Sequence, residues 1–279
     1  MYTHLSLLDT ELFLMTSTNP QRQTELMELP PVSLNLVIDW GNTRIKAGWF
    51  NGGVLVDTAR YVSAEALREA VAKTPPRYVI ASSTSRPASE LRQLLDDFDG
   101  GANWLLLSPE LTIPIRNNYE TPRTLGADRL AAAVGATVLF PAQNCLILDL
   151  GTCLTADFVS ADGSFEGGLI SPGLRMRLQA MHTFTARLPQ IDNVPEPANW
   201  PPLTARNTHD AILSGAMNGM ALELAGIIAD YTNRHPNLRV IVCGGDGPLF
   251  TNRLKPGIFA APELVLQGLN RILLTHTQL

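Results

Sequence analysis

Two segments of the sequence carry an acid directly after an apolar run. The run LVID ends at Asp39 and the run CLILD ends at Asp149, and a glycine and a threonine follow each acid within four residues. Glycine lets a turn approach a ligand closely, and turn amides with threonine hydroxyls suit phosphate oxygens. An acid at a strand end can hold a hard cation such as Mg²⁺, through water, that bridges phosphates. One D-x-G segment is ordinary turn chemistry, but two in the same context favour a nucleotide-phosphate site.

A third acid, Asp128, lies in the segment GADRLAAA at the predicted start of an Ala-rich helix. An acid in a first turn commonly stabilises a helix through its dipole. In the functional interpretation, Gly126 lets a substrate approach, Asp128 takes a proton from a hydroxyl and Arg129 holds an anionic group. The residue types alone slightly favour the dipole role.

The two acid segments belong to a repeat whose acids are 110 residues apart (149 − 39). Each copy begins three predicted strands, and the turns Asn51–Gly53 and Ala161–Ser164 are typical of hairpins. Helices and strands then alternate, which is the plan of the actin-like, or ribonuclease-H-like, ATPase fold. We therefore predict an α/β protein of two duplicated domains, 34–143 and 144–279. Each is a mixed sheet with flanking helices, and the active site lies in the cleft between them.

Periodicity and turn residues place the remaining elements. Gly215 and Gly219, four residues apart on a predicted helix, indicate close helix packing, for which a dimer interface is one location. The Gly244–Gly247 turn either faces an adenosine or simply joins a strand to a helix. The helix over 126–140 is predicted to present Ala127, Leu130, Ala131, Val134 and Val138 on one face. The expected helices span 63–73, 87–98, 126–140, 208–231 and 262–276, and the expected strands span 77–83, 103–108 and 238–243.

Composition limits the classes of protein. The chain has 279 residues, 45% of them hydrophobic and 17% charged, which is enough for one large or two medium domains. The net charge is −5 without a Lys/Arg cluster, so a nucleic-acid partner is not expected. No apolar run reaches the roughly 18 residues that span a bilayer, so no membrane association is expected. Three cysteines without a C-x-x-C pair indicate a reduced, cytoplasmic protein without disulfides or structural zinc.

Residues 1–33 differ from the rest of the chain, because they mix apolar and polar residues without a period. Asp9 and Glu11 interrupt any apolar core of a signal peptide, and no basic segment precedes it. We interpret this segment as an N-terminal appendage. The sequence leaves open whether it is disordered or reflects translation from an upstream start codon.

Four motifs together match those of a known family. Their order and spacing agree from about Leu34 onward, and this part of the chain resembles type III pantothenate kinase. Cys153 stands where alanine is common in that family, which is a mild departure. The motifs are D-x-G-N-T at Asp39–Thr43, Y-x-x-P-x-x-L-G-x-D-R at Tyr119–Arg129, D-x-G-T-x-x-T-x-D at Asp149–Asp157 and G-G-x-I-x-P-G at Gly167–Gly173.

The resemblance implies a kinase that uses ATP with Mg²⁺ to phosphorylate the primary hydroxyl of pantothenate, the first step toward coenzyme A. It implies that Asp128 is the general base, that Asp149 binds a monovalent cation, K⁺ or NH₄⁺, and that Asp39 lies near Mg²⁺. It also implies a homodimer with the substrate site at the interface, completed by the partner subunit's Thr208. The implied ATP contacts are Asp39, Trp40, Gly41, Asn42, Thr43, Arg44, Ile45, Lys46 and Thr152, and the implied pantothenate contacts are Tyr119, Gly126, Ala127, Asp128 and Arg129.

Two other functions stay open at this point. A regulatory or accessory protein on the same fold would be free to lose its acids, and the presence of Asp39, Asp128 and Asp149 favours an enzyme instead. Another actin-fold phosphotransferase, such as a sugar kinase or a polyphosphate phosphatase, does not predict the Tyr119–Arg129 segment. A P-loop kinase is not expected, because the chain has no G-x-x-x-x-G-K-[ST] segment.

Overall fold

The computed structural model describes residues 34–41, 44–83, 90, 92–93, 101–254 and 257–277. The predicted appendage over 1–33 and most of the helix predicted over 87–98 lie outside the described residues. The helices and strands along the described chain are β1 (Asn35–Trp40), β2 (Ile45–Asn51), β3 (Val54–Tyr61), α1 (Ala64–Lys73), β4 (Tyr78–Ser83), β5 (Asn103–Leu106), β6 (Arg116–Asn117), the 3₁₀ turn η2 (Pro122–Thr124), α3 (Ala127–Leu139), β7 (Cys145–Leu150), β8 (Cys153–Val159), β9 (Ser164–Pro172), α4 (Leu174–Thr183), the 3₁₀ turn η3 (Pro197–Asn199), α5 (Thr208–Arg234), β10 (Arg239–Cys243), α6 (Gly247–Thr251), β11 (Ile258–Ala260) and α7 (Leu264–Thr277).

The strands form two sheets with the same internal order, which confirms the predicted duplication. The first sheet runs β3-β2-β1-β4-β5, and the second runs β11-β10-β7-β8-β9-β6. In each sheet the first strand pairs antiparallel with the second and parallel with the fourth of its set. The short strand β6 extends the second sheet beyond β9. Each sheet therefore carries its acid segment on a central strand.

The central strands β1 and β7 are apolar apart from Asn35, Asp39 and Asp149, because both faces of each sheet are covered. All six residues of β1 are buried, and β7 is buried except at its acid. Such strands are near-continuous apolar runs rather than alternating ones. On one face of the first sheet lies α1, which begins after the N-cap Ser63 and directs Leu67 and Val71 inward. Helices α4, α5 and α6 contribute to a core on the second sheet.

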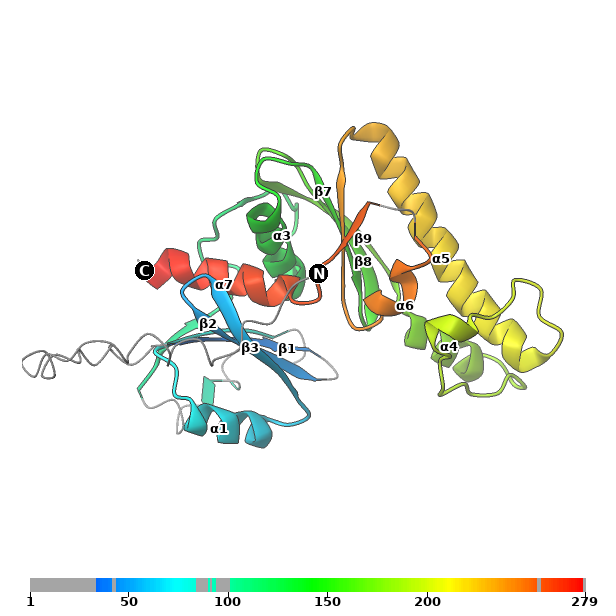
Figure 1. Cartoon of the computed structure of the whole chain (residues 1–279), viewed down its shortest axis with the longest axis horizontal. Helices are drawn as coiled ribbons and strands as arrows, with labels where there is room; N and C mark the ends of the chain where they lie inside the picture. The colour runs from blue at the N-terminus through cyan, green and yellow to red at the C-terminus, as the bar shows by residue number, and fades with distance from the viewer. Residues whose placement is uncertain are drawn as a thin grey trace, which may run out of the picture. The chain divides into compact units, whose positions relative to one another are not determined.

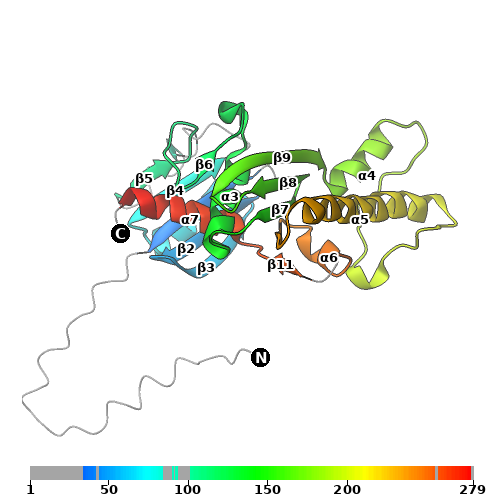
Figure 2. The same ribbon diagram turned by 90° about the horizontal axis from the view of Figure 1, so that it is seen from above.

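Two helices that are far apart in the sequence, α3 and α7, pack closely against each other (Figures 1 and 2). Helix α7 ends the described chain and contacts β1 and β4 of the first sheet, while α3 contacts β7 and β8 of the second sheet. Their backbones touch, because a Cβ on Gly268 would lie 1.8 Å from the Ala131 carbonyl oxygen. One hydrophobic core therefore joins the two sheets.

The structure corrects the predicted face of α3. Residues 131–136 are all buried, because α3 has α7 on one side and strands of both sheets within contact. Val138 lies beyond this enclosed part, and 46% of its surface is exposed. A single apolar stripe is therefore the wrong description of this helix.

Helix α5 is the one described helix that is long and apolar enough, by length and composition alone, to cross a membrane. Its most apolar window of 18 residues has a mean hydropathy of 1.5, and 44% of that window is buried in the fold. This finding is compatible with the expectation that no uninterrupted apolar run reaches 18 residues, because Asn218 and Glu223 interrupt the apolar run of this helix. Core helices of soluble proteins pass the same test, and Met217, Met220 and Leu224 of α5 pack on the second sheet.

Candidate active site

The three predicted acids line one cavity of about 920 Å³. Asp39 comes from the end of β1, Asp149 from the end of β7 and Asp128 from the first turn of α3. The two repeats thus supply the same feature from each sheet, and α3 adds the third acid beside them. The remaining lining residues are Gly41, Arg44, Lys46, Arg60, Leu150, Gly151, Thr152, Cys153, Thr155, Arg175, Met176, Gln179, Ala180, Thr183, Phe184, Gly244, Gly245 and Asp246.

The first acid is positioned by its two neighbouring strands. In the sheet register Asp39 is opposite Lys46 of β2 and beside Ser82 of β4. Ser82 Oγ donates a hydrogen bond of 3.2 Å to Asp39 Oδ1. Burial raises the pKa of Asp39 to about 6, although the Lys46 cation opposes this change. A buried carboxylate with a raised pKa is a group for which a bound cation would provide compensation.

The second acid has the corresponding neighbours. Asp149 is opposite Thr155 of β8 and beside Cys243 of β10, which occupies the place that Ser82 has in the first sheet. Burial raises the pKa of Asp149 to about 6, and Lys46 again opposes the change. Gly244 has a φ of +85°, and a Cβ there would lie 2.4 Å from Asp149 Oδ1. The turn after β10 therefore needs glycine because it closes over this acid.

The third acid is held by the start of its own helix. Asp128 Oδ1 accepts a hydrogen bond of 2.8 Å from the backbone N–H of Arg129. A Cβ on Gly126 would lie 2.6 Å from the same oxygen, so the preceding residue leaves this carboxylate room. The position of Asp128 in the first turn of α3 suits a favourable interaction with the helix dipole, and its carboxylate also lines the cavity. Both interpretations of Asp128 are therefore compatible with its position.

Arg129 makes a buried ion pair with Asp157 of β8. Its Nε lies 3.1 Å from each carboxylate oxygen, and its Nη2 donates to Oδ1 at 2.5 Å. The Arg129 guanidinium also lies over the rings of Tyr119 and Phe165, 5.5 and 5.9 Å from their centroids. The side chain is only 7% exposed and does not line the cavity. The Tyr119–Arg129 segment is thus tied to the second sheet through this residue.

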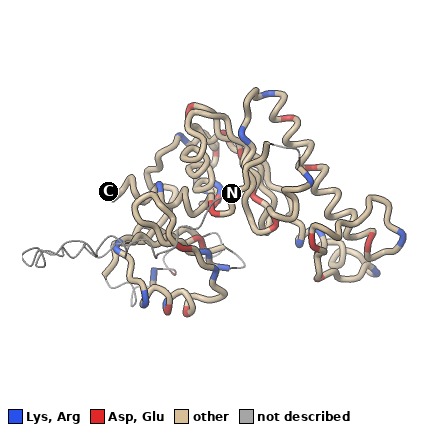
Figure 3. Tube along the Cα trace, viewed as in Figure 1, with Lys and Arg blue, Asp and Glu red and all other residues tan. Residues whose placement is uncertain are grey.

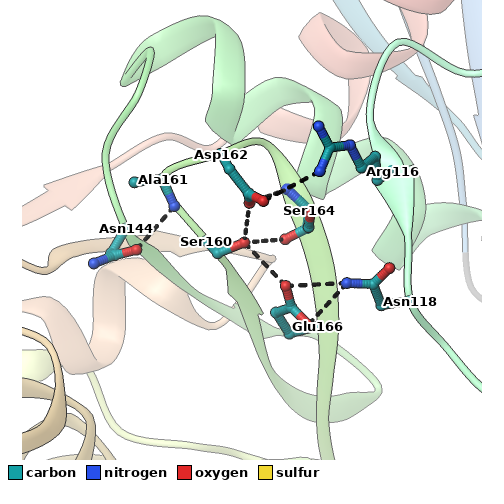
Figure 4. A network of polar contacts seen from close by, with 8 residues as sticks. All are labelled: Arg116, Asn118, Asn144, Ser160, Ala161, Asp162, Ser164 and Glu166. Carbon is teal, nitrogen blue, oxygen red and sulfur yellow. Dashed lines mark hydrogen bonds and ion pairs between the residues drawn. The ribbon is translucent and has the colours of Figure 1, made fainter.

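A polar network fastens β6 to the turn between β8 and β9 (Figure 4). Asn118 Nδ2 donates to the two Glu166 carboxylate oxygens at 3.1 and 3.2 Å, and Arg116 pairs with Asp162 at 3.4 Å. Ser160 Oγ lies 2.6 Å from Asp162 Oδ1 and 3.0 Å from Glu166 Oε1. These groups are exposed, so each pair contributes little stability alone. Together they fix the segment that leads into Tyr119.

The structure brings together part of the predicted site. Of the predicted phosphate contacts, Asp39, Gly41, Arg44, Lys46 and Thr152 line the cavity. Trp40 and Ile45 are buried in the core of the first sheet instead, and Asn42 and Thr43 lie outside the described residues. Of the predicted pantothenate contacts, Asp128 lines the cavity. The others do not line it; they are Tyr119, Gly126, Ala127, Arg129 and Thr208.

Thr208 is the first residue of α5 and is exposed. Figures 1 and 2 both show that this end of α5 lies away from α3. Sequence reasoning missed Arg60 of β3 and Arg175 of α4, which bring two more cations to the cavity. Neither belongs to a recognisable motif, although Arg175 comes two residues after the G-G-x-I-x-P-G segment ends at Gly173.

The donor groups fit a water-bridged Mg²⁺ better than a dedicated metal cage. Among the residues that the structure describes, no group of three or more His, Cys, Asp or Glu side chains has the arrangement of a metal site. Mg²⁺ keeps several waters and is usually bound by one or two carboxylates together with substrate phosphates. The Asp39 carboxylate, buried at the end of β1 and lining the cavity, is an oxygen donor of this kind. Elsewhere on the described trace, acidic and basic positions are interspersed (Figure 3).

The chain is similar to proteins of one family over most of its length. The sequence profile described as type III pantothenate kinase matches residues 35–230. A type III pantothenate kinase of Cytophaga hutchinsonii is 43% identical over 240 residues, which cover 86% of this chain and 98% of that protein. A type III pantothenate kinase of Phocaeicola vulgatus is 40% identical over 242 residues, with coverages of 86% and 98%.

The fold is also found in solved structures of more distant proteins. Component A of (R)-2-hydroxyglutaryl-CoA dehydratase from Acidaminococcus fermentans superposes with a TM-score of 0.52 and 14% identity. The superposition covers 88% of this chain and 98% of that one. At this identity the likeness concerns the fold alone, and it agrees with the predicted actin-like class.

Proposed function

Because the chain belongs to the type III pantothenate kinase family, we propose that it transfers the terminal phosphoryl group of ATP to the primary hydroxyl of pantothenate. The product would be 4′-phosphopantothenate, and the reaction would be the first step of coenzyme A biosynthesis. One observation supports this function most directly: the acids of both repeats and the acid of α3 face a single cavity. Phosphoryl transfer requires in-line positioning, charge neutralisation and a base for the hydroxyl, and little covalent chemistry from the protein.

On the donor side, the turn after β1 and Thr152 would contact the phosphates of ATP. The position of Lys46 supports this role, because it lies opposite Asp39 on β2 and lines the cavity. Asp39 would hold Mg²⁺ through water, and Asp149 would hold K⁺ or NH₄⁺. When bound, these cations would neutralise the charge of the phosphates. The backbone turns after both acids are tight, with Gly41 N–H donating to the Arg44 carbonyl and Gly151 N–H to the Cys153 carbonyl.

On the acceptor side, Asp128 would take the proton of the pantothenate hydroxyl. A positioned base typically contributes about 10²–10⁴-fold to the rate. The Tyr119–Arg129 segment would form the pantothenate pocket beside it, because Tyr119 packs against Arg129 and against the Phe165 ring at 6.0 Å.

The three cysteines are free, which agrees with a cytoplasmic location.

The pocket would be completed by a second copy of the chain through the exposed side of α5. A Cβ on Gly215, Gly219 or Gly226 would meet nothing within 4 Å, and Leu222 is 66% exposed. These residues recur at helical spacing, as in helix pairs that approach closely. Thr208 begins the same helix, so an interface formed there supports the partner subunit's Thr208 as a substrate contact. Leu222→Arg should give a monomer by light scattering and lower turnover; an active monomer would contradict the shared site.

The function is tested by following ADP release with pantothenate and MgATP, in K⁺ and again in Na⁺ alone. Turnover that depends on pantothenate and rises with K⁺ is the expected result. A folded dimer without turnover in either salt would favour the alternative, a regulatory or accessory protein on this fold. Turnover with sugars instead of pantothenate would favour another actin-fold kinase.

A further inference from the structure

Asp157 is a charged residue of the D-x-G-T-x-x-T-x-D motif to which the proposed reaction gives no task. It lies in the middle of β8, is 1% exposed, and pairs with Arg129 through three contacts of 2.5 to 3.1 Å. A buried ion pair is weak support for stability, because desolvation of both charges offsets their attraction. A pair in this position is therefore better explained by what it holds in place.

The neighbours of the pair are shaped around it. Gly168 is opposite Asp157 in the sheet, and a Cβ there would lie 2.0 Å from the Ala156 carbonyl oxygen and 2.6 Å from Asp157 Oδ1. Gly167 has a φ of +98°, and a Cβ there would lie 3.3 Å from the Tyr119 ring. The two glycines that begin the G-G-x-I-x-P-G motif thus leave room for the carboxylate and for the tyrosine.

The pair also connects the second sheet to the acid of α3. Arg129 follows Asp128 directly, and its backbone N–H donates to the Asp128 carboxylate. Arg129 uses its Nε and Nη2 on Asp157 and is enclosed by aromatic rings, so its side chain is fixed to β8. A shift of Arg129 would move the first turn of the helix, and a displacement of about 1 Å at a catalytic group can cost on the order of 10²-fold in rate.

We propose that Asp157 is a positioning residue, which holds Arg129 and thereby fixes the first turn of α3 and the Asp128 carboxylate against the second sheet. This proposal rests on the proposed function for the role of Asp128. It predicts that a change at Asp157 lowers turnover without weakening MgATP binding. The reason is that this lock, the Arg129–Asp157 ion pair, contacts the acceptor side and not the turns that contact the nucleotide.

The decisive variant is Asp157→Asn, which keeps the shape of the side chain and removes the charge. We expect kcat to fall about 10- to 100-fold, while MgATP binding, measured by calorimetry, stays within about twofold of the wild type. Asp57→Asn is the matched control, because it makes the same chemical change at an exposed residue of β3 in the first sheet, which does not line the cavity. This control should keep both properties.

A double variant guards against failure to fold, since Asp157→Asn leaves a buried arginine without its partner. Arg129→Gln with Asp157→Asn forms a neutral pair and is judged by the same criteria. Asp157→Asn alone, Arg129→Gln alone and the double variant all break the same contact between Arg129 and Asp157. Their losses in kcat should therefore be similar rather than additive. Turnover of folded Asp157→Asn within twofold of the wild type would overturn the proposal. So would a parallel loss of MgATP binding, which indicates general disruption.

Hydrogen exchange provides a readout that does not depend on turnover. In Asp157→Asn, the amides of residues 128–131 should exchange about tenfold faster or more, because a charge-assisted contact that anchors this turn is lost. Asp57→Asn should leave them unchanged. Unchanged exchange in Asp157→Asn would overturn the lock even if the wild type does not act on pantothenate. An inactive wild type with faster exchange in Asp157→Asn would retain the lock and reject only the proposed function.

Discussion

The two acids at the strand ends make the stability of the metal-free protein depend on pH in a defined direction. Burial raises the pKa of Asp39 and of Asp149 from 3.8 to about 6, against the opposing Lys46 cation. Between these values the folded protein holds protons that the unfolded chain has released. The free energy of unfolding therefore falls as the pH rises from about 4 through 6.

The magnitude follows from the two pKa values. A difference of about two units corresponds to about 3 kcal/mol per carboxylate over the whole range of pH. From pH 5 to pH 7 alone, a folded pKa near 6 and an unfolded pKa near 3.8 give about 1 to 1.5 kcal/mol per carboxylate. The two carboxylates together should therefore lower the free energy of unfolding by about 2 to 3 kcal/mol over this interval.

The assay is urea unfolding in EDTA at pH 5, 6 and 7, followed by tryptophan fluorescence. The control is the double variant Asp39→Asn with Asp149→Asn, because its difference from the wild type isolates the two acids from histidines and surface groups. The wild type should lose stability relative to this variant as the pH rises. A wild type that gains stability relative to the variant, or a difference that does not change with pH, would refute the reasoning. MgATP with K⁺ should reduce the dependence in the wild type, because cations bind the ionised acids of the folded state and so stabilise it more as the pH rises.

Three further predictions concern single residues. Asp128→Asn should lower kcat about 10²–10⁴-fold with the dimer and MgATP affinity retained; turnover near that of the wild type would remove Asp128 from the role of base. Asp149→Ala should abolish activation by K⁺ in the ADP-release assay, an outcome that fails if Na⁺ supports the wild type equally well. Gly168→Ala should lower the free energy of unfolding by about 1 to 3 kcal/mol, because its Cβ would lie 2.0 Å from a carbonyl oxygen. Gly53→Ala, where a Cβ meets nothing within 4 Å, is the control for urea unfolding and should change it little.

The parts of the fold that depend on local pattern were predictable from the sequence. The apolar strands that end at Asp39 and Asp149 and the turns that follow them disclosed the repeat, and the structure confirms two sheets of the same order. Helix α4 and strand β11 were not named, because α4 has no clear apolar stripe and β11 has only three residues. Short or weakly patterned elements form through tertiary contacts, which the local pattern of residues does not reveal.

The candidate site was predictable where the motif residues are themselves in the cavity, as for Asp128. What surrounds the acids depends on register between strands that are far apart in the sequence. Ser82 lies beside Asp39 only because β4 pairs with β1, and Cys243 lies beside Asp149 only because β10 pairs with β7. The partner of Arg129 is 28 residues away on another element. Such partners require knowledge of which strands and helices are adjacent.

The packing of α7 on the first sheet has a consequence for synthesis of the chain on the ribosome. Strands β1 and β4 are made early, but the helix that covers them begins only at Leu264, roughly 180 residues after β4 ends. At about 5–20 residues per second, the first sheet waits about 10 to 40 s for that cover. During this interval an apolar face is open to chaperones and to neighbouring nascent chains. A chain truncated before Leu264 would leave that face exposed permanently. A premature stop codon near the end of the mRNA would therefore disable the half of the protein that is made first.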